Sequence, residues 1–483
     1  MKQAAAVLAI AILGLGAGAA TVPDDQSTIE HVLNRMAFGP RPGEVEKIGA
    51  IGVERYIDQQ LHPERIQDAD MPRRLADLMT IGLSSREIAE RFERPQMEAR
   101  RERRRNATGT VDERPMLRQG EKKPNTLVIE LAEQKLLRAI YSERQLQEVL
   151  TDFWFNHFNV DARKGRDRFL LTEYERDTIR PRVLGKFRDL LEADAKSPAM
   201  LFYLDNWMNA GTGTGFRSRA RGNPSPTRSP AQGPNARNGL NENYARELME
   251  LHTLGVDGGY TQTDVTEVAR AFTGWTIGPP RRGGEFTFEP RLHDVGEKVV
   301  LGHRINAGGG MNDGEQVLDI LAKHPSTARF IAAKLVRRFV SDTPPAALVD
   351  RAAKRFRDTD GDLREVMRTI LTSPKFLAPE TFRAKAKTPF EFIVSAVRTT
   401  GADVQDPLPL VRAVQQLGMP LYQCQPPTGY TDTADAWLNT GALVNRMNFA
   451  VRLAHNQLPG VALTADAPED LALAIGGPEF QRR

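Results

Sequence analysis

The sequence predicts an all-α, multi-helix globular protein with one small β-hairpin near residues 285–301. Apolar residues recur with a helical period of 3.6 in most segments. Alternating runs of the kind found in strands are confined to Glu285–Phe288 and Lys298–Leu301, which could pair across His293-Asp294. The content of 40% hydrophobic and 27% charged residues is ordinary for a globular protein. With 483 residues, the chain can bury one large core or two smaller ones.

The first twenty residues predict a secretory signal peptide. Lys2 is the charged start, Ala4 to Leu15 the apolar centre, and Ala17-Gly-Ala19 the small-residue cleavage site. An uncleaved membrane anchor is the alternative. No other segment is apolar enough to span a bilayer, so we expect a periplasmic or secreted protein without an integral membrane segment after cleavage. The single cysteine, Cys424, can form no internal disulfide, so stability must come from the core.

The charge of the chain is close to balance. Its net charge of +4 results from 66 basic and 62 acidic residues. The basic excess is local and centres on Arg100–Arg105, within a charged stretch that predicts an exposed helix running into a flexible loop. Because no aromatic residues are interleaved with these arginines, we expect no nucleic-acid partner.

Periodicity and composition divide the chain into nine regions. They are a signal peptide (1–20), an N-terminal helical region (21–85), a charged flexible insertion (86–125), a helical core with an aromatic helix (126–210), a disordered loop (211–239), a central helix–turn–helix (240–275), a loop and hairpin region (276–310), a C-terminal helical region (311–458) and a tail (459–483).

The most aromatic stretch, residues 153–160, predicts a helix that is buried on most of its faces. His157 lies among its aromatic residues, and Asn156 and Asn159 add polar groups that are costly to bury. A buried histidine usually has a hydrogen-bond partner and no catalytic role. Use of His157 as a ligand or an acid–base group is the alternative, and both interpretations stay open.

The region 240–275 predicts two helices joined by a glycine-rich turn. Asn241 is a candidate N-cap of the first helix, and Gly255 ends it. Thr261 or Thr263 would cap the second helix. The dense run of Asn, Glu, Arg and His on the first helix is either a solvated set of ion pairs or the lining of a pocket.

The candidate site combines histidines and carboxylates from this region and from the aromatic helix. The candidate catalytic residues are His157, His252, Glu247, Glu250 and Asp205. The candidate substrate-binding residues are Asn241, Glu242, Asn243, Arg246 and Trp275. The candidate metal ligands are His157, His252, His293 and Asp294, because three imidazoles and a carboxylate would suit Zn²⁺ or another transition metal. A divalent metal is therefore an open possibility as cofactor.

Motifs of familiar enzymes are missing from the sequence. It contains no nucleotide fingerprint, GxSxG elbow, HExxH or CxxC. A serine hydrolase or a zincin of a familiar kind is therefore disfavoured.

Several phrases together resemble a known family. They are HVLNRMAFGPRPGEVEKI, TDFWFNHFNVD, AMLFYLDN, NENYARELMELHTLGVDGGYTQTDV, AFTGWT, HPSTARFIAAKL and PPTGY. Over about residues 30–453 the chain resembles the secreted bacterial family catalogued as domain of unknown function eighteen-hundred. The resemblance implies a mostly helical, exported bacterial protein with a co-exported, sulfatase-like partner. It implies no established activity.

Two functional hypotheses follow. The first is an exported hydrolase with a His and carboxylate site, with or without metal. The second is a non-catalytic periplasmic binding or assembly protein that works with a co-exported partner. Convergence of His157, His252 and Asp205 in one cleft would favour the enzyme.

Overall fold

The computed structural model describes residues 24–106, 125–211, 239–279, 284–463 and 468–483. The predicted signal peptide and residues 212–238 of the predicted loop lie outside these ranges. Helices dominate the described chain and share one large hydrophobic core that draws on both its N-terminal and C-terminal parts, which confirms the predicted fold class. None of the described helices is both long and apolar enough to cross a membrane.

The α-helices follow each other along the whole chain. Their bounds are α1 (Gln26–Met36), α2 (Glu44–Ile51), α3 (Val53–Gln60), α4 (Met71–Arg74), α5 (Ser85–Ile88), α6 (Arg94–Asn106), α7 (Asn125–Tyr141), α8 (Gln145–His157), α9 (Leu171–Glu173), α10 (Phe187–Ala195), α11 (Pro198–Tyr203), α12 (Glu242–Glu247), α13 (Gln262–Ala271), α14 (Asn312–Lys323), α15 (Pro325–Phe339), α16 (Ala346–Asp358), α17 (Leu363–Leu371), α18 (Pro389–Thr400), α19 (Leu408–Gln416), α20 (Thr440–Ala454) and α21 (Leu471–Gly476).

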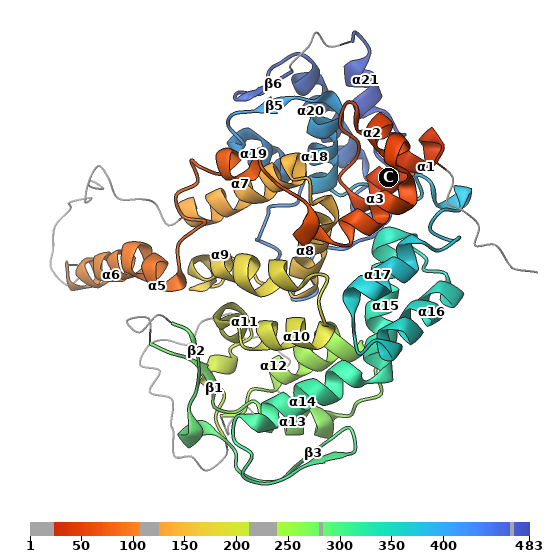
Figure 1. The fold of residues 1–483 in the computed structure, drawn as a ribbon. Helices are drawn as coiled ribbons and strands as arrows, with labels where there is room; N and C mark the ends of the chain where they lie inside the picture. The colour runs from red at the N-terminus through yellow and green to blue at the C-terminus, as the bar shows by residue number, and fades with distance from the viewer. Residues whose placement is uncertain (1–23, 107–124, 212–238, 280–283, 464–467) are drawn as a thin grey trace, which may run out of the picture.

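The two ends of the described chain lie together. In Figure 1 the red helices α1 to α3 stand beside the blue C-terminal helices, whereas α10 to α14 form the lower part of the molecule. Arg398 of α18 is fully buried and donates to the carbonyls of Gly39 and Ile140, each over 2.8 Å. One side chain therefore joins the segment after α1, the end of α7 and α18.

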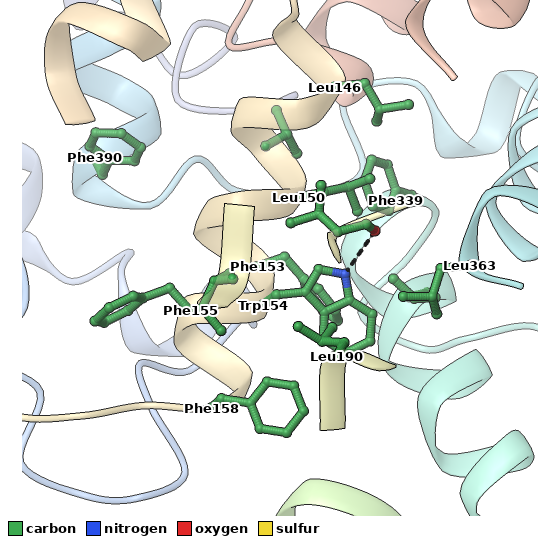
Figure 2. Packing of buried hydrophobic residues seen from close by; sticks show 14 of the residues in the cluster. Leu146, Leu150, Phe153, Trp154, Phe155, Phe158, Leu190, Phe339, Leu363 and Phe390 are labelled. Atoms are coloured by element: carbon green, nitrogen blue, oxygen red, sulfur yellow. Dashed lines mark hydrogen bonds between the residues drawn. The ribbon is translucent and has the colours of Figure 1, made fainter. Parts of the chain in front are cut away.

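Helix α8 occupies the centre of the fold, as its aromatic sequence predicts. Figure 2 shows Trp154 pointing into the core toward Leu190 and Leu363. Trp154 has no exposed surface, and its indole N–H donates to the carbonyl of Val183 over 3.3 Å. Because the aromatic face is buried, the polar residues of α8 must find partners inside the protein.

The small β-structure differs from the predicted hairpin. Strand β1 (Trp275–Ile277) pairs with β2 (Phe286–Phe288), and β3 (Lys298–Val300) pairs with β4 (His303–Ile305). The two predicted strands therefore belong to different hairpins, and the predicted pairing across His293-Asp294 is wrong. A third antiparallel pair joins β5 (Asp403–Val404) to β6 (Val461–Ala462). Segments of three residues carry too little alternation to select a partner.

Two segments are more regular than the sequence suggested. The charged stretch begins as a helix, with α5 and α6 joined by the π-helical segment η2 (Ala89–Glu93), and residues 107–124 lie outside the described ranges. The tail forms β6 and α21. In the segment after α21, an isolated antiparallel β-bridge joins Arg482 to Ala386. This segment places Arg483 inside the protein, where its side chain is 3% exposed.

Candidate functional site

A cleft of about 260 Å³ lies between α8, α15, the start of α18 and the loop 419–433. Its volume is just below the usual range for small-molecule sites, which points to a small ligand. The lining residues are Asp152, Phe153, Asn156 and His157 from α8, Lys334, Arg337 and Arg338 from α15, the N-cap residue Thr388, and Met419, Thr428, Gly429, Tyr430, Thr431, Asp432 and Thr433 from the loop. Threonine hydroxyls, cationic groups and the two carboxylates Asp152 and Asp432 thus face the same space.

A hydrogen-bond chain fixes the protonation of His157. Its Nε2 lies 3.1 Å from the carbonyl oxygen of His252, which can only accept a hydrogen bond. Nε2 therefore carries the proton, and Nδ1 presents a lone pair. The Nζ of Lys334 lies 2.8 Å from Nδ1 and is the donor. Burial, together with Lys334, holds the pKa of His157 well below its usual range, so the imidazole is neutral.

Lys334 and Arg337 are cations without a carboxylate partner in the described ranges. No Asp or Glu oxygen there lies within 4.0 Å of either side chain, although their neighbours on α15, Arg329 and Arg338, have such partners. Burial lowers the pKa of Lys334 to about 8; the positive charge of Arg337 acts in the same direction, and Asp432 opposes it. The Nε of Arg337 is buried and makes no hydrogen bond with any described residue.

Asn156 builds the opposite wall of the cleft. Its side-chain amide donates to the carbonyl of Tyr430 over 2.8 Å and accepts from the N–H of Tyr430 over 2.7 Å. Asn159 donates to the carbonyls of Cys424 and Pro426, each over 2.9 Å. The loop backbone therefore satisfies both asparagines, which explains why the buried aromatic segment contains Asn156 at the end of α8 and Asn159 just after it.

A cluster of buried ion pairs adjoins the cleft. Glu391 of α18 accepts hydrogen bonds from Arg338 and, over 2.8 Å, from the N–H of Thr388, and it forms an ion pair with Arg483, whose Nε lies 3.1 Å away. Asp432 lies 3.8 Å from both arginines and links this cluster to the cleft loop. Arg338 is thus held by carboxylates, which leaves Lys334 and Arg337 as the cations available to a ligand.

The structure places the two central histidine candidates side by side. The rings of His157 and His252 lie 6.2 Å apart, but only His157 lines the cleft, because His252 is buried behind it. His252 Nδ1 lies 3.7 Å from Asp194, which is too long for a hydrogen bond. Burial raises the pKa of Asp194 to about 8, and burial with Lys334 lowers the pKa of His252 to about 3. Both groups are therefore neutral near pH 7.

The proposed metal ligands do not gather around one point. His293 is bonded to the carbonyl of Thr273 at 2.8 Å and to Asp313 at 3.1 Å, whereas Asp294 pairs with Arg270 at 3.0 Å. Across the described ranges, no three His, Cys, Asp or Glu side chains are arranged to hold a metal ion.

The polar candidates of the central region tie its two helices together. Asn241 is the N-cap of α12 and Thr261 that of α13, as predicted. The other side-chain bonds join Glu242 to Gln262 (2.9 Å), Arg246 to Gln262 (2.7 Å) and Glu250 to Tyr260 (3.0 Å). Asn243 is exposed on the same helix.

The remaining candidates also lie outside the cleft lining. Burial, reinforced by Glu250, raises the pKa of Glu247 to about 7. Asp205 pairs with Lys164 at 2.9 Å. Trp275 has no exposed surface and packs against Phe272 and Phe286.

Sequence reasoning missed Lys334, Arg337 and the loop 428–433. The stretch AAKLVRRF has the ordinary pattern of a helix with a charged face. Two motifs of the family resemblance offered a signal: HPSTARFIAAKL contains Lys334, and the Gly of PPTGY, between polar and aromatic residues, marks a tight loop.

These features define an all-α protein with a cation-lined cleft at its centre. The chain belongs to the family described as protein of unknown function (DUF1800), whose family model matches residues 31–481. Neither a curated protein nor a solved structure matches the chain. The resemblance inferred from the sequence motifs is therefore confirmed at the level of the family.

Proposed function

We propose that this protein binds a small anionic ligand, a carboxylate or a phosphate ester, in the cleft beside α15. One observation carries the proposal: Lys334 and Arg337 face the cleft without a carboxylate within 4.0 Å in the described ranges. A buried or half-buried cation is costly to leave unpaired. An anionic ligand would remove that cost, and the hydroxyls of Thr428 and Thr431 could orient it. This is the binding-protein hypothesis with a defined ligand chemistry.

Replacing Arg337 with glutamine should weaken anion binding at least about tenfold, equivalent to about 1.4 kcal/mol. Isothermal titration with phosphate, sulfate, acetate and citrate gives the affinity of each for the parent protein and the variant. Arg329→Gln is the matched control, because Arg329 lies on the same helix but pairs with Asp350 away from the cleft. Equal losses in both variants, or no saturable binding of any anion by the parent, would reject the proposal.

A hydrolase is the second candidate, and the pairing of Lys334 with His157 favours it. A lysine with a pKa of about 8 can exchange a proton near neutral pH, as a general acid or base must. One experiment distinguishes the binding function from the hydrolase function. A ligand that is recovered unchanged after prolonged incubation supports binding, whereas its conversion by the parent but not by Lys334→Met supports the hydrolase.

Export, a periplasmic or secreted location and a co-exported sulfatase-like partner stay part of the proposal. Their support is the sequence of residues 1–20 and the family resemblance. Fractionation of cells that produce the full chain tests the location: recovery only from the cytoplasm would reject it.

A further inference from the structure

Lys334 combines three features that distinguish it from a surface lysine. It lines the cleft, it has no carboxylate within 4.0 Å in the described ranges, and its one hydrogen-bond partner there is the bare Nδ1 of a neutral imidazole. An ammonium group that pairs with a carboxylate is held in its charged form. Here burial favours the amine, because the cleft walls remove water; the charge of Asp432 opposes this effect and that of Arg337 adds to it.

The hydrogen bond also orients the amine. Since Nδ1 of His157 can only accept, one N–H of Lys334 points at the imidazole. The lone pair of the neutral amine must then point elsewhere, and the cleft is the open space around it. Lysines that act as nucleophiles in enzymes are activated by desolvation or by a neighbouring cation.

We propose that Lys334 is a nucleophilic amine that forms an imine with small anionic aldehydes or oxo acids bound in the cleft. The inference rests on the proposed anion binding, since Arg337 would hold the ligand's anionic group. The inference adds the class of substrate. The ligand's carbonyl carbon must lie within reach of Lys334 Nζ while its anionic group binds the Arg337 guanidinium.

The proposed step is balanced within the bound pair. Nζ attacks the carbonyl carbon, a C–N bond forms, and the carbonyl π electrons move to oxygen. Nitrogen loses both of its N–H protons to that oxygen, the first after the addition and the second as the C–O bond breaks, and the Nδ1 lone pair of His157 is the nearest acceptor that can relay them. The C–O bond then breaks, water leaves, and a C=N bond remains. No oxidant, reductant or further reactant is needed.

Trapping with glyoxylate and cyanoborohydride tests the inference on the parent protein. Cyanoborohydride reduces an imine to a stable secondary amine, and peptide mass mapping then gives the rate at each lysine. At pH 7.5 about a quarter of a group with a pKa near 8 is neutral, against about 0.1% for an ordinary lysine. We expect Lys334 to react at least tenfold faster than Lys47, which is exposed and weakly paired. Equal rates at the two lysines would overturn the proposal.

Arg337→Gln separates this proposal from the anion site on which it rests. The variant should slow the glyoxylate reaction at Lys334 severalfold more than the reaction with neutral propanal, because loss of the Arg337 charge affects the amine equally in both reactions. Anion binding with an unreactive Lys334 would reject the imine and leave the binding function standing. Fast reaction with both aldehydes, unaffected by Arg337→Gln, would keep the nucleophile and reject the anion site. Lys334→Arg, which retains the charge, should abolish labelling at this position without loss of helical signal.

Discussion

Replacing Glu391 with glutamine should destabilise the protein by about 3–5 kcal/mol, the usual cost of removing one member of a buried ion pair. Glu391 is 3% exposed and holds both Arg338 and Arg483, which are 4% and 3% exposed. The amide can still accept from the N–H of Thr388, so the helix cap survives. The lost unfolding free energy therefore measures what it costs to leave the guanidinium groups of Arg338 and Arg483 without their shared carboxylate. Urea denaturation of parent and variant measures it.

The same carboxylate should make the protein sensitive to acid. Burial alone would raise the pKa of Glu391, but Arg338 and Arg483 outweigh it and lower the pKa to about 2, from 4.5 in an unfolded chain. A lowered pKa contributes stability that is present above the unfolded value and is lost as the pH falls toward the folded one. Between pH 4.5 and 2 the unfolding free energy of Glu391→Gln should therefore fall less steeply than that of the parent protein.

Glu380→Gln is the matched control for both measurements. Glu380 is an exposed carboxylate whose partner, Lys375, is exposed as well. Its removal should leave the unfolding free energy nearly unchanged. A Glu391→Gln variant as stable as this control, with the same acid transition as the parent, would contradict the account of the cluster.

Replacing Gly429 with alanine should cost about 2–4 kcal/mol and open the cleft wall. Gly429 has a φ of +73°, and a Cβ there would lie 2.2 Å from the backbone oxygen of Asn156. The side chain cannot relieve a clash with backbone, so the loop must move away from α8. Both hydrogen bonds between Asn156 and Tyr430 would then be lost. Denaturation and anion titration together measure the effect.

Gly418→Ala isolates the backbone strain from the clash. Gly418 also has a positive φ, +92°, but nothing lies within 4 Å of its Cβ position. This variant should lose only about 1–2 kcal/mol and retain anion binding. If the two glycine variants behave alike, the packing of the loop on α8 does not shape the cleft.

The parts of the fold that the sequence predicted are those governed by local rules. The period of apolar residues predicted the helices, and the caps Asn241 and Thr261 follow from hydrogen bonding within one turn. The proximity of His157 and His252 could also be anticipated, because both lie on helical faces too apolar to be exposed. The pairing of β2 with β1 could not be anticipated, since strands of three residues do not define a register.

The candidate site was only half predictable for a related reason. Lys334 and Arg337 differ from Arg329 and Arg338 by what packs against them, not by their position in the pattern of α15. Arg338 lines the same cleft but is paired with Glu391, and the loop around Tyr430 that closes the cleft lies about a hundred residues further along the chain. Conversely, Glu242 and Arg246 form the dense polar pattern that suggested a pocket, but they join α12 to α13. A polar stretch of sequence alone does not show whether its side chains join two helices or line a pocket.

Diffraction from crystals soaked in selenate tests the central claim most directly, because the anomalous signal of selenium locates a bound anion without reference to any assay. We predict the strongest selenate peak in the cleft, within hydrogen-bond distance of Lys334 Nζ and the Arg337 guanidinium, and its loss in Arg337→Gln crystals. Peaks confined to surface arginines such as Arg329, with an empty cleft in the parent crystals, would contradict the claim.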